Sequence, residues 1–186
     1  MTDINSRSDA ARAVHGVPAA ADAPVKDALS VEDGIDFAII ELFFFAYRDF
    51  TSDPDEILGE LDFGRAHHRV VHFVNRMPGL TVAELLDVLQ ITKQSLARVL
   101  KQLIDSGYIM QVQGPRDRRQ RELYPSARGR ELALRLAAPQ SRRIREALRQ
   151  TGPEHRAAIE TFLRAMVNTE LRPQIDRLPG NLSAEP

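Results

Sequence analysis

The 186-residue sequence contains no cysteine. Disulfide bonds, thiolate-bound zinc, iron–sulfur clusters, a cysteine nucleophile and regulation by thiol oxidation are therefore excluded. Long apolar runs are also missing, because the richest stretch, residues 35–47, is interrupted by Asp36 and Glu41 and is shorter than the ~20 residues that span a bilayer. Residues 1–26 lack the continuous apolar core of a signal peptide. We therefore expect a cytoplasmic protein with no membrane partner.

The sequence also lacks the common signatures of enzymes. It contains no glycine-rich phosphate loop, no Gly-x-Ser-x-Gly elbow and no His-Glu-x-x-His motif. Its many acidic residues are scattered over residues 27–62, and no apolar pocket is implied around them. The length and the 43% apolar composition fit one globular domain with helical arms. We expect neither catalytic activity nor a bound cofactor.

The formal net charge of −1 conceals a strong separation of charge along the chain. Residues 27–62 contain eleven acids and one base, a net charge of −10. Residues 92–130 contain nine bases and three acids, a net charge of +6. A basic block inside a near-neutral chain indicates a local surface for a polyanion. A solvated helix face followed by an exposed loop would give the same pattern of charge.

The N-terminal part of the chain divides into an arm and an aromatic helix. Residues 1–30 are rich in Ala, Asp and Pro without periodicity, which predicts a disordered arm. From residue 31 to about residue 51 the pattern is helical but apolar on nearly every side, and residues 52–55 are predicted to form a turn. We expect residues 31–61 to pack against a second copy of the chain. Burial of this helix within one subunit is the alternative.

A helix-turn-helix follows. A helix is expected to end at residues 77–79, where proline and glycine stop it. Thr81 and Glu84, three positions apart, form a capping box that starts a short helix. Thr92 then caps a second helix over about residues 92–106, whose apolar side chains recur at i, i+3, i+4 and i+7. These signals predict two helices joined by a tight turn.

A basic β-hairpin is predicted directly after these helices. Strands are expected over residues 108–112 and 121–124, with a turn between them. Pro125 lacks a backbone N–H and should keep the second strand short. We call the hairpin region from about residue 113 to 122 the wing. Residues 62–125 together then form a winged helix-turn-helix domain.

Two further helices complete the prediction. Ser126 is expected to cap a long helix, and Pro139 should kink or interrupt it. A Gly-Pro pair breaks this helix before a last one, whose end Pro173 should weaken. We assign these helices to residues 126–178 and a tail to residues 179–186.

The second helix and the hairpin carry residue types suited to DNA. A helix-turn-helix places its second helix in the major groove, and an arginine-rich finger can enter the minor groove. The residues that can reach phosphates and base edges are Thr92, Lys93, Gln94, Ser95, Arg98, Lys101, Gln102, Arg116, Arg118, Arg119 and Arg121. Alone, the helix would be an ordinary core helix and the hairpin a solvated turn, but their succession favours DNA binding. The alternative is a winged-helix module that binds another protein without specific DNA binding.

Three sequence features resemble the MarR (multiple antibiotic resistance regulator) family of winged-helix transcription factors. They are the helix-turn-helix of residues 81–106, the Leu-Ile-Asp-Ser-Gly-Tyr-Ile sequence of residues 103–109, and an Asp-x-Arg wing followed by Gly129. The helix opening at residues 91–96 is similar to the branch of this family called PetP. The sequence departs from the family pattern at residues 125–126, where Pro-Ser replaces the usual Leu-Thr.

The resemblance implies a mainly α-helical fold with a small β-hairpin wing, in which a winged helix-turn-helix is flanked by N- and C-terminal dimerisation helices. It implies a homodimer that binds a pseudo-palindromic operator in double-stranded DNA and acts as a ligand-responsive repressor. In such proteins the arginine that matches Arg119 enters the minor groove, and the aspartate that matches Asp117 holds the wing in shape. The dimerisation residues implied here are Phe37, Ile40, Phe44, Phe162, Leu163 and Met166.

The resemblance also implies a small aromatic or other organic-acid effector, bound between the dimerisation helices and the winged helix. The candidate lining residues are Tyr47, Arg48, His68, His72 and Arg76. His68 and His72 are spaced i, i+4 in a group that includes His67, so both could face one metal ion. A zinc site needs three or four ligands, and no third one is fixed nearby in the sequence. We therefore predict no metal site.

Overall fold

The structure is a computed structural model that describes residue 28 and residues 34–114 and 120–180. Contacts divide the chain after Ala38 into two units, and the architecture below concerns the larger unit, which begins at Ile39. The first helix, α1, is Phe37–Gly59. The elements after it are α2 (Arg65–Arg76), β1 (Leu80–Thr81), α3 (Val82–Leu89), α4 (Lys93–Asp105), β2 (Ile109–Gln113), β3 (Arg121–Pro125), α5 (Ala127–Thr151), α6 (Arg156–Met166) and α7 (Arg172–Asp176), with single 3₁₀ turns at Pro153–His155 and Thr169–Leu171.

The first helix is longer at its C-terminal end than the sequence indicated. The predicted turn at residues 52–55 is wrong, because α1 continues through a buried Pro54 to Gly59. Proline cannot donate a hydrogen bond to the carbonyl four residues earlier, which here belongs to Phe50. The side chain of Gln140 on α5 donates to that carbonyl instead, at 3.2 Å. The carbonyl therefore keeps a partner, and the helix tolerates the proline.

The helix-turn-helix forms with the caps that the sequence predicted. The Thr81 hydroxyl accepts from the backbone N–H of Glu84 at 3.2 Å, while the Glu84 carboxylate accepts from the backbone N–H of Thr81 at 2.7 Å. The Thr92 hydroxyl accepts from the backbone N–H of Ser95 at 3.1 Å and starts α4. Between the two helices, Gln90 adopts the left-handed conformation with a φ of 50°. These local bonds fix α3 and α4 at the tight turn between them.

One apolar core joins these helices to the sheet. The apolar stripe of α4 is buried, as its helical spacing predicted. It belongs to the same hydrophobic cluster as buried valines of α2, leucines of β1, α3, β3 and α5, and Ile109 of β2, so the helices and strands of the winged helix share this core. The main members are Val70, Val71, Val74, Leu85, Leu89, Leu96, Val99, Leu100, Leu103, Leu123, Leu132 and Leu136.

The wing hairpin belongs to a three-stranded antiparallel sheet of order β1-β3-β2. The third strand, β1, was not predicted, because two residues are too few to show an alternating pattern. The second hairpin strand was expected to be short, yet β3 runs over five residues and ends on Pro125 itself. Pro125 lies opposite Ile109 at the end of the ladder, where a missing N–H costs little.

Residues 126–180, the described C-terminal part, contain three α-helices rather than the two that were expected. Pro139 does not interrupt α5, which runs unbroken to Thr151. Pro173 lies in the first turn of α7 instead of weakening the end of α6, since proline suits the first turn of a helix. α6 packs back on α1, where the rings of Phe43 and Phe162 stack with their centroids 6.0 Å apart.

Candidate nucleic-acid interface

The outer face of α4 is polar and open. Thr92, Lys93, Gln94, Ser95 and Arg98 are all exposed, whereas the opposite face of the helix lies in the core. Within residues 34–114 and 120–180, neither Lys93 nor Arg98 makes an ion pair. Their charges are therefore available to an outside anion.

Lys101 lies on the same helix but has a partner. Its ammonium group pairs with the carboxylate of Asp105, four residues further along α4, and both side chains are well exposed. Exposed pairs of this kind contribute at most about 1 kcal/mol, so a phosphate could compete for the lysine. Lys101 is predicted from its position on α4 to contact DNA, and the structure adds this counter-ion.

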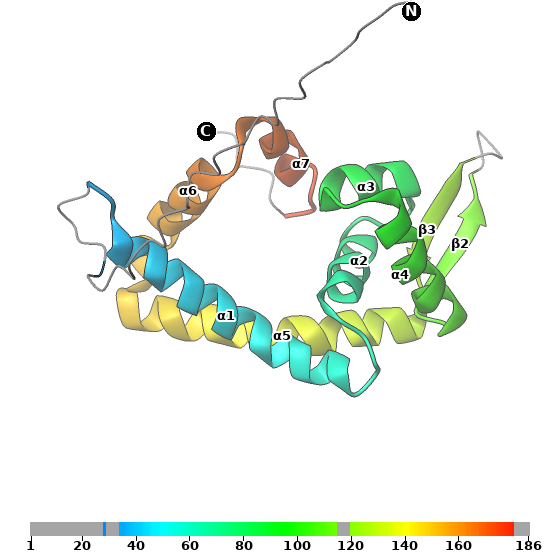
Figure 1. Cartoon of the computed structure of the whole chain (residues 1–186), viewed down its shortest axis with the longest axis horizontal. Coiled ribbons are helices and arrows are strands. Elements are labelled where there is room, and N and C mark those ends of the chain that lie inside the picture. Colours follow the sequence, from blue (N-terminus) through cyan, green and yellow to red (C-terminus); the bar gives the residue numbers. More distant parts are fainter. Residues whose placement is uncertain (1–27, 29–33, 115–119, 181–186) are drawn as a thin grey trace, which may run out of the picture. The chain divides into compact units, whose positions relative to one another are not determined.

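The wing begins next to α4. Gly107, with a φ of 74°, ends the helix and leads into β2, and α4 packs on that strand (Figure 1). The backbone N–H of Gly114 donates to the carbonyl of Gln120 at 3.0 Å, which closes the hairpin below its tip. Arg121 at the start of β3 is exposed. The predicted wing residues Arg116, Asp117, Arg118 and Arg119 lie outside the described residues, so their roles stay predictions.

The base of the wing is fastened to the start of α5. The hydroxyl of Ser126 accepts from the backbone N–H of Gly129 at 2.9 Å and donates to the carbonyl of Gly107 at 2.7 Å. The backbone N–H of Ser126 donates to the carbonyl of Tyr108 at 3.1 Å. One serine therefore caps α5 and holds the junction between α4 and β2 at the same time.

The predicted effector residues lie on α1 and α2. Arg48 donates to the carboxylate of Asp49 at 2.8 Å and lies 4.9 Å from the centroid of the Phe45 ring, while Tyr47 is well exposed. Desolvation lowers the pKa of His68. Desolvation, helped by the nearby charges of His68 and Arg76, also lowers the pKa of His72. The role of both imidazoles with an effector stays a prediction.

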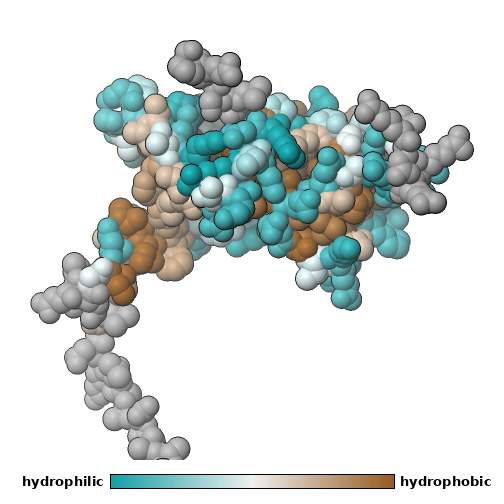
Figure 2. Space-filling view, turned by 90° about the horizontal axis from the view of Figure 1, so that it is seen from above, coloured by the Kyte–Doolittle hydropathy of each residue, from teal (hydrophilic) through white to brown (hydrophobic). Residues whose placement is uncertain are grey.

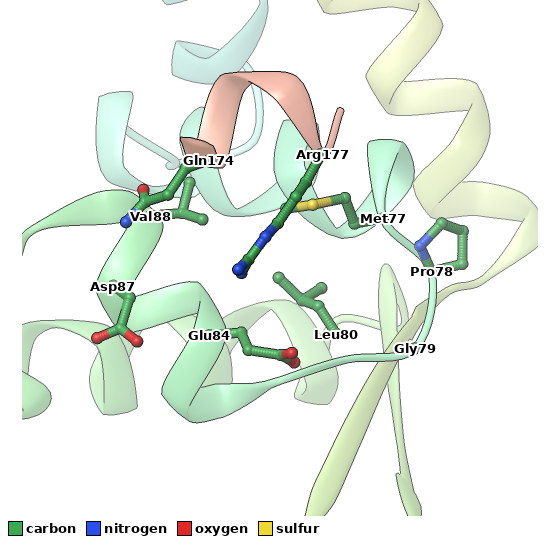
Figure 3. A pocket seen from close by; sticks show the side chains of 9 residues that line it. All are labelled: Met77, Pro78, Gly79, Leu80, Glu84, Asp87, Val88, Gln174 and Arg177. Carbon is green, nitrogen blue, oxygen red and sulfur yellow. The ribbon is translucent and has the colours of Figure 1, made fainter. Parts of the chain in front are cut away.

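A cavity of about 330 Å³ lies elsewhere, between the α7 end of the chain, α3 and the segment of residues 77–80 (Figure 3). Arg177 reaches into it from α7, and Glu84 borders it from α3. Hydrogen bonds from the backbone and hydroxyl of Thr81 lower the pKa of Glu84, with a smaller contribution from the charge of Arg177. None of the five predicted effector residues lines this cavity.

One contact between α2 and α4 was not predicted from the sequence. Gln102 was grouped with the DNA-facing side chains, but its amide oxygen is hydrogen-bonded to a ring nitrogen of His67, at 2.8 Å. The two residues are 35 positions apart, and His67 was considered only as part of a histidine cluster. No sequence signal joins them, because the contact follows from the crossing of α2 and α4.

In the part of the chain that the structure describes, no helix combines the length and the apolar character needed to cross a membrane.

Comparison with known proteins identifies the family. A family model described as MarR family matches residues 61–120. The chain is 50% identical over 133 residues to the HTH-type transcriptional regulator PetP of Rhodobacter capsulatus, and this match covers 72% of the chain and 80% of that relative.

Solved structures share the fold. A MarR protein from Peptoclostridium difficile superposes with a TM-score of 0.64 at 19% identity, over 80% of this chain and 97% of the other. A MepR mutant from S. aureus bound to an oligodeoxyribonucleotide superposes with a TM-score of 0.50 at 17% identity, over 71% of this chain and 96% of the other. These comparisons confirm the predicted fold class and family. The chain belongs to the MarR family of DNA-binding transcriptional regulators, which are not enzymes.

Proposed function

We propose that the protein is a homodimeric repressor that binds a pseudo-palindromic operator through α4 and the wing. The observation that supports it most is the exposed polar face of α4, where Lys93 and Arg98 have no ion pair among the described residues, and which adjoins β2, the first strand of the hairpin. The residues proposed to contact DNA are Thr92, Lys93, Gln94, Ser95, Arg98, Lys101, Arg116, Arg118, Arg119 and Arg121. Asp117 is proposed to hold the wing in shape.

The N-terminus of α4 suits a phosphate. Thr92 satisfies the backbone N–H of Ser95, while the other N–H groups of the first turn have no partner within the helix. These groups and the positive end of the helix dipole attract an anion, and the exposed Lys93 adds a full charge. Gln94 and Arg98, one turn apart on the same face, are of the types that read adenine and guanine edges. The backbone N–H groups and Lys93 would then hold the phosphate, while Gln94 and Arg98 read base edges.

The two-fold dimer is supported by apolar surface that one chain leaves open. Phe44 on α1 is 70% exposed, and Phe162, Leu163 and Met166 on α6 are each about half exposed. Figure 2 shows hydrophobic side chains gathered on the surface near the start of α1. A monomer rarely exposes so many large apolar side chains on two adjacent helices. We propose that Phe37, Ile40, Phe44, Phe162, Leu163 and Met166 meet their counterparts in a second copy.

We further propose that an organic-acid effector regulates this dimer. Tyr47, Arg48, His68, His72 and Arg76 supply aromatic surface, positive charge and hydrogen-bond donors on α1 and α2. α2 contacts both α4 and α5, so a ligand that moved α2 would act on the DNA-binding helix. Release of the operator on binding an organic acid is the expected response of such a repressor.

Salt dependence of DNA binding tests the function. The double substitution Lys93→Ala with Arg121→Ala should lower the slope of log affinity against log salt by about four, because the dimer loses two phosphate contacts per chain and each lost contact removes about one released counter-ion. The matched control is Arg142→Ala with Arg145→Ala, which removes the same charge from exposed positions on α5. Fluorescence anisotropy with a labelled duplex measures all three proteins.

The control should keep the wild-type slope. If all three proteins showed the same slope of log affinity against log salt, Lys93 on α4 and Arg121 in the wing would not contact DNA phosphates. A wild-type protein whose affinity for duplex DNA did not depend on salt would instead favour the protein-binding module.

A further inference from the structure

His67 is held in one orientation by hydrogen bonds at both ring nitrogens. It is the third residue of α2 and only 8% exposed. Its Nδ1 accepts from the backbone N–H of Gly64 at 3.1 Å, so it closes the first turn of α2 as Glu84 does in α3. With Nδ1 accepting, the ring proton lies on Nε2 and is donated to the amide oxygen of Gln102, 2.8 Å away. The donor and acceptor roles of the ring are thereby fixed.

The ring is also packed into a row of aromatic contacts. It stacks on Phe63, with centroids 4.6 Å apart and planes 10° from parallel. Phe63 meets Tyr108 edge-on at 5.5 Å, and the guanidinium of Arg128 lies 4.4 Å from the Tyr108 ring centroid. The row therefore runs from the start of α5, past the base of the wing, to the N-terminus of α2. His67 is the last ring of this row, and its hydrogen bond to Gln102 links the row to α4.

Gln102 lies on the same side of α4 as the two residues proposed to read bases. Gln94, Arg98 and Gln102 are spaced four residues apart and form one ridge along the helix. Leucine and valine side chains hold the opposite face, but apolar contacts are not directional. A rotation of α4 by about 20° would move side-chain tips by about 2 Å, given a helix radius of about 6 Å with side chains. Base-edge hydrogen bonds tolerate only about 0.5 Å.

We infer that His67 is a positioning residue for DNA recognition: through Gln102 it sets the rotation of α4 about its own axis, and thus which base edges Gln94 and Arg98 reach. This rests on the proposed function, because it gives α4 the reading role. His67 touches no DNA in this scheme. Its effect should appear in the preference for the operator over other sequences, and not in the affinity for DNA in general.

Two substitutions separate the two hydrogen bonds. In His67→Asn, the shorter amide can place its oxygen near the position of Nδ1, which keeps the acceptor for Gly64 and removes the bond to Gln102. In His67→Gln, the longer amide can place its NH₂ near the position of Nε2, which keeps the donor to Gln102 and removes the acceptor for Gly64. Gln102→Leu removes the same bond from an exposed position that should leave folding intact.

The measurement is the ratio of affinities for an operator duplex and for a scrambled duplex of the same length and composition, at one salt concentration. His67→Asn and Gln102→Leu should each lower this ratio about tenfold, since a dimer loses two bonds worth roughly threefold each. His67→Asn should not change the affinity for the scrambled duplex, because His67 is buried and touches no DNA in this scheme. His67→Gln should keep the ratio within about twofold, even if urea unfolding shows it to be less stable. Combining His67→Asn with Gln102→Leu should add nothing further.

An unchanged ratio in His67→Asn and Gln102→Leu would overturn the inference. The inference would also be overturned if His67→Asn and His67→Gln lowered the affinity ratio equally and in proportion to their loss of stability. That pattern would mean that His67 has only a structural role. If the wild type itself did not prefer any duplex over its scrambled version, the proposed function would fail and the inference with it. If the wild type prefers the operator duplex and His67→Asn and Gln102→Leu show the same preference, the inference about His67 is overturned but the proposed function stands.

Discussion

Replacing Gly129 by alanine should destabilise the winged helix by about 2–4 kcal/mol. A Cβ atom at this position would lie 1.9 Å from the carbonyl oxygen of Tyr108 and 3.0 Å from its carbonyl carbon. That oxygen also accepts from the backbone N–H of Ser126, so relief of the clash would break the junction between α4, the wing and α5. The gain of about 1 kcal/mol that alanine usually brings to a helix cannot offset this overlap.

Urea unfolding followed by circular dichroism measures the effect. Gly59→Ala is the matched control, because nothing lies within 4 Å of the corresponding Cβ and the residue is the last of α1. This control should be neutral or slightly stabilising. A Gly129→Ala protein as stable as the wild type would show that α5 does not approach the wing base as closely as the structure has it.

The substitution Phe44→Glu should weaken dimerisation at least ~1,000-fold. Burial of a phenylalanine side chain contributes roughly 1.5–3 kcal/mol, and each substitution counts twice across a two-fold axis. Phe44 is 70% exposed in one chain, so most of its surface is available for burial between copies. The glutamate would in addition place two carboxylates in an apolar interface.

Sedimentation velocity over a range of protein concentrations measures the dimer constant. Leu134→Glu is the control: Leu134 is 67% exposed on α5 and is not one of the six residues proposed to meet across the two-fold axis, so this variant should remain dimeric. A Phe44→Glu protein that dimerised as tightly as the wild type would place the two-fold contact on another surface. A monomeric wild type at micromolar concentration would contradict the dimer itself.

The helix-turn-helix could be predicted because its signals are local. The Thr81–Glu84 capping box and the cap at Thr92 each lie within one turn of the helix that they start. Prolines were harder to interpret. Pro54 remains helical because Gln140, far along the chain, satisfies the carbonyl that proline leaves without a partner. Sequence patterns do not show which distant side chain is close enough to do this.

The candidate site could be predicted in part, because the exposed face of a helix also follows from local signals. Residue type and helical spacing predicted the exposed face of α4, and Lys93 and Arg98 lie on it. The role of Gln102 depends on the crossing of α2 and α4, which brings His67 against it. The close approach of Gly129 to Tyr108 is likewise a tertiary contact, although the glycine had been singled out by resemblance.

Hydroxyl-radical footprinting of the full chain on the DNA upstream of its own gene tests most directly whether a dimer recognises a pseudo-palindromic operator. A two-fold dimer that inserts one α4 into each of two major grooves should protect two half-sites centred roughly 10 base pairs apart and related by a dyad in the sequence. Protection should fade as salt is raised. A single unpaired protected segment, or uniform protection of every sequence offered, would contradict operator recognition by paired α4 helices.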